Sequence, residues 1–103
     1  MAAGKPEASK VVETGEGVAG LQGPVTLETA AGLLAQLKPL IAANLKTLSF
    51  GAVSELDSAA LGLILSCRRL AASHGRDNLK FVDLPENLTA LAKLYGVSEL
   101  IAI

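Results

Sequence analysis

Residues 59–67 form an apolar segment without a charged side chain, and Arg68 and Arg69 follow it directly. A membrane-spanning helix needs about 20 consecutive apolar residues, so this segment is too short to cross a bilayer. A helix on the surface of a domain normally has a charged or polar face, and no charge marks such a face here. The segment must therefore be covered by protein, either by its own domain or by a partner.

The residues before this segment change from strand-like to helix-like patterns. Residues 11–14 and 17–23 predict the two strands of a hairpin, because glycines lie between them. From residue 26 the apolar residues have helical spacing, with Glu28 in the first turn, and Pro39 is expected to kink or end the helix. The predicted apolar stripe of this helix is Leu27, Ala30, Ala31, Leu34, Leu37 and Ile41.

The middle of the chain continues the alternation. Residues 46–50 predict a strand, and residues 52–56 predict a loop. Asp57 and Ser58 predict the start of the uncharged helix, because a side-chain oxygen at this position accepts a free backbone N–H of the first turn. This helix is expected to end at His74, which we expect to cap its last carbonyl groups.

The last third predicts a strand, a helix and a further strand. Residues 79–82 form the strand, and residues 83–86 have a capping-box pattern with Asp83 as the N-cap. The helix that follows is closed by Gly96, and residues 100–103 predict a final short strand. The predicted apolar stripe of this helix is Leu88, Leu91, Ala92 and Tyr95.

The predicted order of elements, ββαβαβαβ, indicates an α/β fold. We expect a mixed sheet of about five strands with three helices, largely parallel after the opening hairpin. A chain of 103 residues buries enough surface for one core, so residues 11–103 are expected to form a single domain. Residues 1–10 are expected to be a flexible tail, and they lack the apolar stretch of a secretory signal.

The composition argues against several classes of function. The net charge of −1 and the aromatic content of 3% do not suit nucleic-acid binding. One cysteine and one histidine cannot form a metal site, and Cys67 lies among apolar residues, which predicts a buried thiol in a reducing compartment. A hydrolase needs a nucleophile, a base and an orienting group, and the only histidine, His74, stands in a Ser-His-Gly sequence at a helix end, where a lone histidine most often caps the last carbonyl groups. We therefore expect no catalytic residues, no metal, no cofactor and no enzyme activity.

Residues 15–20 match the G-x-G-x-x-G pattern of dinucleotide-binding proteins. In that motif the glycines end a strand and begin a helix, whose N-terminus holds the pyrophosphate. Here the motif leads to Gly23 and Pro24, which do not start a helix. We interpret it as a hairpin turn.

Asp57 and Ser58 have two interpretations. They form a helix cap and nothing more, or the cap also presents a regulatory site. If Asp57 is the cap, Ser58 is the first helical residue and its hydroxyl lies outside the helix. A phosphate there would lie at the positive end of the helix dipole and add about −2 charges to the surface.

Residues 59–67 also have two interpretations, because either the domain itself or a partner protein covers them. Small residues near the start of the helix, Ala59, Ala60 and Gly62, would let another chain approach closely. Exposed apolar surface of this kind often marks a protein interface, and we favour this interpretation.

The sequence resembles a STAS domain, the fold of bacterial anti-sigma-factor antagonists, of sulfate-transporter C-terminal domains and of the MlaB component of a lipid-trafficking ABC transporter. The resemblance starts near residue 18 and rests on residues 21–23, on the signature loop and helix start over residues 53–61, and on the closing helix. The closing residues 84–97 are similar to MlaB-like proteins. The signature reads Asp-Ser-Ala-Ala, where the antagonists usually have Asp-Ser-Ser-Gly.

The MlaB-like resemblance implies a non-enzymatic subunit that binds the cytoplasmic ATPase of a phospholipid transporter. Such a subunit would be cytoplasmic and would reach the inner face of the membrane only through the transporter complex. Ser58 corresponds to the position that is phosphorylated in the antagonists and lies at the partner interface in MlaB-like proteins. Asp57 corresponds to the acidic residue that holds the loop. The neighbours implied on the same surface are Ser54, Glu55, Ala59 and Gly62.

The alternative is an anti-sigma-factor antagonist that is switched by phosphorylation of Ser58. Its partners would be an anti-sigma factor and serine kinase rather than an ATPase. The two interpretations share the fold and the site.

Overall fold

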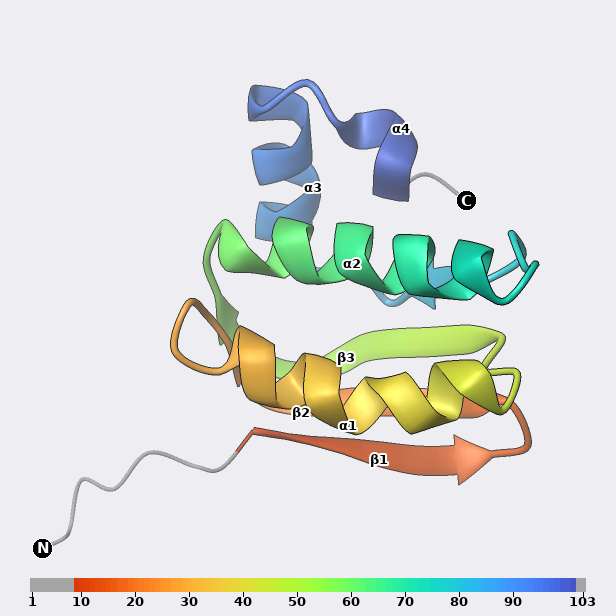
Figure 1. Ribbon diagram of the computed structural model, residues 1–103. Coiled ribbons are helices and arrows are strands. Elements are labelled where there is room, and N and C mark those ends of the chain that lie inside the picture. The colour runs from red at the N-terminus through yellow and green to blue at the C-terminus, as the bar shows by residue number, and fades with distance from the viewer. Residues whose placement is uncertain (1–8, 102–103) are drawn as a thin grey trace, which may run out of the picture.

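The computed structural model describes residues 9–101 and contains, in this range, four strands and four helices (Figure 1). Residues 1–8 of the predicted tail lie outside the described residues. The elements are β1 (Lys10–Gly15), β2 (Val18–Val25), α1 (Ala30–Ala42), β3 (Thr47–Leu56), α2 (Ala59–Ser73), β4 (Lys80–Val82), α3 (Glu86–Leu94) and α4 (Ser98–Ile101).

The sheet is mixed, with the strand order β1-β2-β3-β4. β1 pairs antiparallel with β2, whereas β2, β3 and β4 run parallel. The α/β fold with a sheet that is parallel after an opening hairpin is therefore confirmed. The hairpin itself contains the glycine motif: β1 ends at Gly15, Gly17 has a φ of +72°, and β2 begins at Val18, as we expected for a turn.

The predicted final strand is wrong, so the described residues contain four strands instead of about five. Residues 98–101 form the short helix α4, which packs beside α2 and α3, and residues 102 and 103 lie outside the described residues. A short apolar run fits a strand or a buried helix equally well. Ser98 and Glu99 precede it, and both residue types favour the start of a helix.

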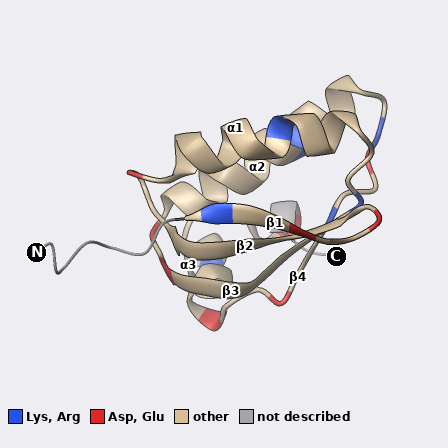
Figure 2. Ribbon diagram, turned by 90° about the horizontal axis from the view of Figure 1, so that it is seen from below, with Lys and Arg blue, Asp and Glu red and all other residues tan. Residues whose placement is uncertain are grey.

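The helices lie on one face of the sheet and at one edge. α1 and α2 cover the same face, and α3 and α4 lie beyond β4 against α2 (Figures 1 and 2). The core between these layers contains Phe50 and Phe81, whose rings meet edge to face with centroids 6.3 Å apart. The guanidinium of Arg68 lies 5.0 Å from the centre of the Phe81 ring. Among the described residues, every buried side chain is hydrophobic.

α1 begins four residues later than predicted and buries a different stripe. Thr29 closes a turn in front of it, because its Oγ1 accepts the N–H of Thr26 (2.9 Å) and donates to the carbonyl of Pro24 (2.9 Å). The side chain of Leu27 is consequently outside the helix and 80% exposed. Pro39 lies inside α1 without ending it. The buried residues of α1 are Leu33, Leu37 and Ile41.

The predicted loop over residues 52–56 is also wrong, because β3 continues to Leu56. Its second half is held by parallel pairing with β2, in which Gln22 is the partner of Ala52 and Val25 is the partner of Leu56. Pairing in the sheet outweighs the weak strand propensity of a Gly-Ala-Val-Ser-Glu sequence.

The predicted cap of α3 differs as well. α3 begins at Glu86 after Pro85, and the carboxylate of Asp83 accepts a hydrogen bond from the Ser49 hydroxyl (2.8 Å) instead of capping the helix. Asp83 has a φ of +55°, which turns the chain out of β4. The buried face of α3 is narrower than its predicted stripe: Leu88 and Ala92 are buried, Leu91 is half-buried and Tyr95 is 56% exposed.

Candidate partner-binding site at the start of α2

Asp57 holds the start of α2 with both oxygens of its carboxylate. Its Oδ1 accepts the backbone N–H of Ala59 (2.8 Å), and its Oδ2 accepts the backbone N–H of Leu27 (3.1 Å). Its own N–H donates to the carbonyl of Val25 at the end of β2 (3.2 Å). The predicted cap at Asp57 is therefore confirmed. The same carboxylate also ties the start of α2 to the loop between β2 and α1.

Ser58 is exposed and already has helical dihedral angles, φ −63° and ψ −16°. Its hydroxyl makes no capping hydrogen bond, so it faces solvent at the start of the helix. The N–H groups of Ala59 and Ala60 are already bonded to Asp57, through its carboxylate and its carbonyl. A phosphate on Ser58 would therefore have to compete with Asp57 for the Ala59 N–H.

The other predicted site residues fall into two groups. Ala59 and Gly62 lie on one surface of α2, where both line a groove against α1. Ser54 and Glu55 are exposed, but they are consecutive residues of β3. Consecutive side chains of a strand point to opposite faces, so these two are not expected to lie on one surface. Their role at a partner interface stays a prediction.

Most of the uncharged segment is covered by the domain itself. Ala60, Leu61, Leu63, Ile64 and Cys67 are buried, while Ala59, Leu65 and Ser66 are half-buried and Gly62 is exposed. Our expectation that residues 59–67 mainly form an interface with a partner protein is therefore too broad. Within the segment, the residues that remain partly or fully open to contact are Ala59, Gly62, Leu65 and Ser66, and three of them line the groove.

Burial also explains the chemistry of Cys67. The thiol is buried in the core, as predicted, and desolvation by burial raises its pKa to about 12. A thiol with such a pKa stays protonated at neutral pH, and only the thiolate is a good nucleophile. Cys67 therefore belongs to the core rather than to a reactive site.

The groove at the start of α2 has a volume of about 310 Å³. From α1 it is lined by Ala30, Ala31 and Leu34, which the sequence had suggested for the core. Leu33, Leu37 and Ile41 also follow one another at four-residue spacing, and this spacing was the sequence signal for the buried side of α1 that we missed. Other lining residues are Ala59, Gly62, Leu63 and Ser66 of α2.

Leu27 is a second feature that sequence reasoning missed. Its side chain is exposed, and its backbone N–H donates to the carboxylate of Asp57, the residue before Ser58.

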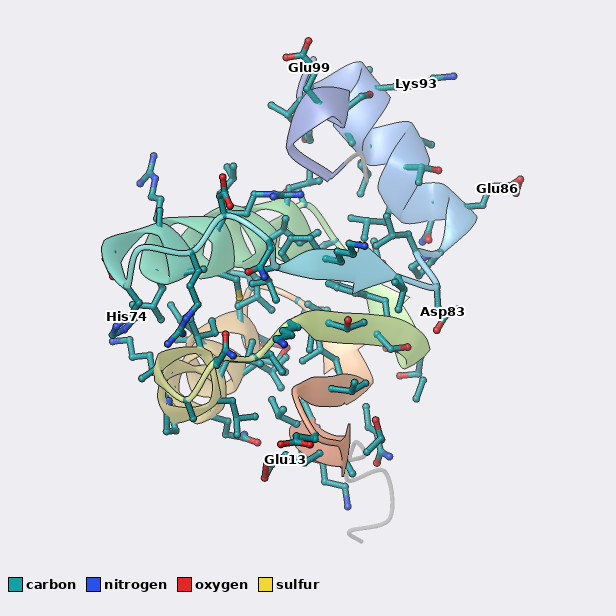
Figure 3. The ribbon with its side chains drawn as sticks, turned by 90° about the vertical axis from the view of Figure 1, so that its right-hand side faces the viewer. Glu13, His74, Asp83, Glu86, Lys93 and Glu99 are labelled. Carbon is teal, nitrogen blue, oxygen red and sulfur yellow. The ribbon has the colours of Figure 1, made fainter. Side chains whose placement is uncertain are left out.

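His74 is the remaining side chain considered for catalysis. His74 lies at the C-terminal end of α2, far from α3 (Figure 3). Its backbone N–H donates to the carbonyl of Ala71 (3.0 Å). We expected the imidazole ring to cap the last carbonyl groups, whereas the backbone of His74 makes this cap. Within residues 9–101 no cluster of three His, Cys, Asp or Glu residues is placed to hold a metal ion. In the same range, none of the helices has the length and apolar character needed to cross a bilayer.

Comparison with known proteins identifies the fold and the family. The chain is similar to the anti-sigma-factor antagonist SpoIIAA in its unphosphorylated form, with a TM-score of 0.62 and 14% identity over 84% of this chain and 83% of the other. It is similar to the phosphorylated form of the Bacillus cell fate determinant SpoIIAA, with the same score and identity over 92% and 89%. No curated protein sequence gives a significant match. The family model described as "Mlab, STAS domain" matches residues 10–102, and the chain belongs to this family.

Proposed function

We propose that this chain is a non-enzymatic, cytoplasmic subunit that binds the ATPase of an ABC transporter for phospholipids. The observation that carries the proposal is the exposed start of α2, where Ser58 follows Asp57, which binds the backbone N–H of the exposed Leu27, and precedes Ala59, which lines the groove against α1. Membership in the Mlab family supports an ATPase as the partner. The chain would then meet the membrane only through the transporter complex.

The proposal is tested by co-purification. The tagged chain is expressed in its source organism, and the proteins bound to it are identified by mass spectrometry. We expect the ATPase of an ABC transporter among them. Ser58→Glu places a charge at the centre of the contact and should lower the recovery of the ATPase by about tenfold or more.

Ser98→Glu is the matched control, since Ser98 is likewise an exposed serine at the start of a helix, in this case α4. It should bind the ATPase as the wild type does. Unchanged binding by Ser58→Glu would place the interface elsewhere on the domain. A wild-type chain that recovers no ATPase would contradict the proposed function itself.

A second candidate is an anti-sigma-factor antagonist that is regulated by phosphorylation of Ser58. The solvent-facing hydroxyl of Ser58 supports it, as does the fold likeness to SpoIIAA. Incubation of the chain with ATP and the serine kinases of the source organism, followed by mass spectrometry, separates the candidates. Phosphate on Ser58, together with recovery of an anti-sigma factor, would favour the antagonist. An unmodified Ser58 and a bound ATPase would favour the transporter subunit.

A further inference from the structure

The groove between α1 and α2 continues well past the start of the helices. A second hollow, of about 300 Å³, lies further along the same two helices and shares Leu34 and Ser66 with the first. The two hollows are therefore neighbours along the same pair of helices, and together we call them the α1–α2 groove. The lining of the second hollow is Leu34, Lys38, Ser66, Arg69, Leu70 and Ser73.

The two ends of the α1–α2 groove differ in charge. The end near Ser58 is lined by alanine, glycine, leucine and one serine, none of them charged. The other end carries Lys38 from α1 and Arg69 from α2, and both side chains are exposed. Within residues 9–101 no acidic side chain forms an ion pair with either cation. The groove thus combines an apolar part with an unneutralised positive end.

The shape of the groove suits a helix. Two packed helices leave a depression between them that the ridge of a third helix fills, and apolar helices bind proteins in this way. The space over α2 is open, because a Cβ atom added to Gly62 would meet no atom within 4 Å. A partner backbone is therefore able to approach α2 closely at Gly62, while the half-buried Leu34 and Leu70 offer apolar contact.

We propose that the α1–α2 groove binds an amphipathic helix of the partner, with its apolar stripe over Gly62 and Ser66 and acidic residues at the end beside Lys38 and Arg69. The charges across the contact are then complementary, which raises the association rate and selects the partner. This inference rests on the proposed function for the identity of the partner as an ATPase. The groove and its charges are properties of this chain alone.

The test uses a synthetic amphipathic peptide of about 18 residues, long enough to form helix in water. It has alanine and leucine on one face and glutamate residues in one terminal turn. The control peptide has lysine in place of each glutamate. Each is added to the full ¹⁵N-labelled chain, and amide shifts are followed by NMR. We expect the glutamate peptide to shift the amides of Gly62 and Ser66, and to bind about tenfold more tightly than the control.

The double variant Lys38→Glu/Arg69→Glu should reverse this preference. Its matched control is Lys80→Glu/Lys93→Glu, which changes the net charge equally at exposed positions of β4 and α3. Lys93 lies on α3 (Figure 3), whereas the groove is lined by residues of α1 and α2. Circular dichroism checks that both variants fold. Equal binding of the two peptides, shifts confined to other surfaces or no binding of either peptide would overturn the inference.

The same double variant separates this inference from the proposed function. If the ATPase still co-purifies with Lys38→Glu/Arg69→Glu at the wild-type level, the ATPase is the partner but the groove is not its site. If the glutamate peptide binds in the groove and no ATPase is recovered with the wild type, the groove is correct and the partner is not an ATPase.

Discussion

At the scale of single residues, one carboxylate organises the candidate site. Asp57 accepts N–H groups from Ala59 in α2 and from Leu27 in the loop before α1. Both α2 and this loop are thus fixed around Ser58, whose own hydroxyl is left open. Asp57, which the sequence suggested as a helix cap, therefore also joins two segments that are 30 residues apart. The sequence contained the cap but not the second bond, because local patterns do not report long-range contacts.

Replacing Asp57 should destabilise the domain through the loss of both bonds. Asp57→Ala removes a helix cap and leaves the Leu27 N–H without its acceptor, so we expect a loss of about 1–2 kcal/mol in the free energy of unfolding. Urea denaturation followed by circular dichroism measures it. Asp77→Ala is the matched control, since Asp77 is an exposed aspartate, and its change should stay within about 0.5 kcal/mol. Equal stabilities of the two variants would show that the Asp57 bonds contribute nothing.

At the scale of elements, the sequence predicted which segments are helices and strands better than which sides they bury. In α1, Leu37 and Ile41 belong to both available stripes, and the packing of the helix decides that Leu33 is buried while Leu34 lines the groove. In β3, the second half is a strand because β2 is beside it. The groove was not predictable for the same reason. It depends on how two helices pack, whereas the Asp57 cap depends on a few consecutive residues.

Two neighbouring leucines test the assignment of the buried side of α1. Leu33 is 1% exposed, whereas Leu34 is half-buried at the edge of the α1–α2 groove. Leu33→Ala leaves a cavity in the core and should cost about 2–5 kcal/mol of unfolding free energy. Leu34→Ala should cost distinctly less, because solvent reaches the truncated site. Chemical denaturation of both variants gives the two values, and a larger loss for Leu34→Ala would mean that the stripe predicted from the sequence is the buried one.

At the scale of the whole molecule, a single layer of core joins the sheet to the helices. α1 and α2 cover one face of the sheet, and the described residues bury only hydrophobic side chains between the layers (Figures 1 and 3). A core of this kind has few ways to respond to pH, because its titratable groups lie outside it. Cys67 is the exception, as a thiol that is fully enclosed. Its ionisation is therefore linked to the unfolding of the entire domain.

This linkage predicts a loss of stability at high pH. Burial raises the pKa of Cys67 from 9.0 to about 12, so the folded chain holds the thiol proton more tightly than the unfolded chain. The resulting stabilisation is complete below pH 9.0 and disappears as the pH rises toward 12, with a slope of up to about 1.4 kcal/mol per pH unit. Urea denaturation of the wild type and of Cys67→Ala between pH 7 and 11 isolates this effect, since lysine and tyrosine titration is common to both. The difference in unfolding free energy between the two should be constant up to about pH 9 and should then shift against the wild type. Parallel curves over the full range would mean that the thiol ionises as easily in the folded chain as in the unfolded one.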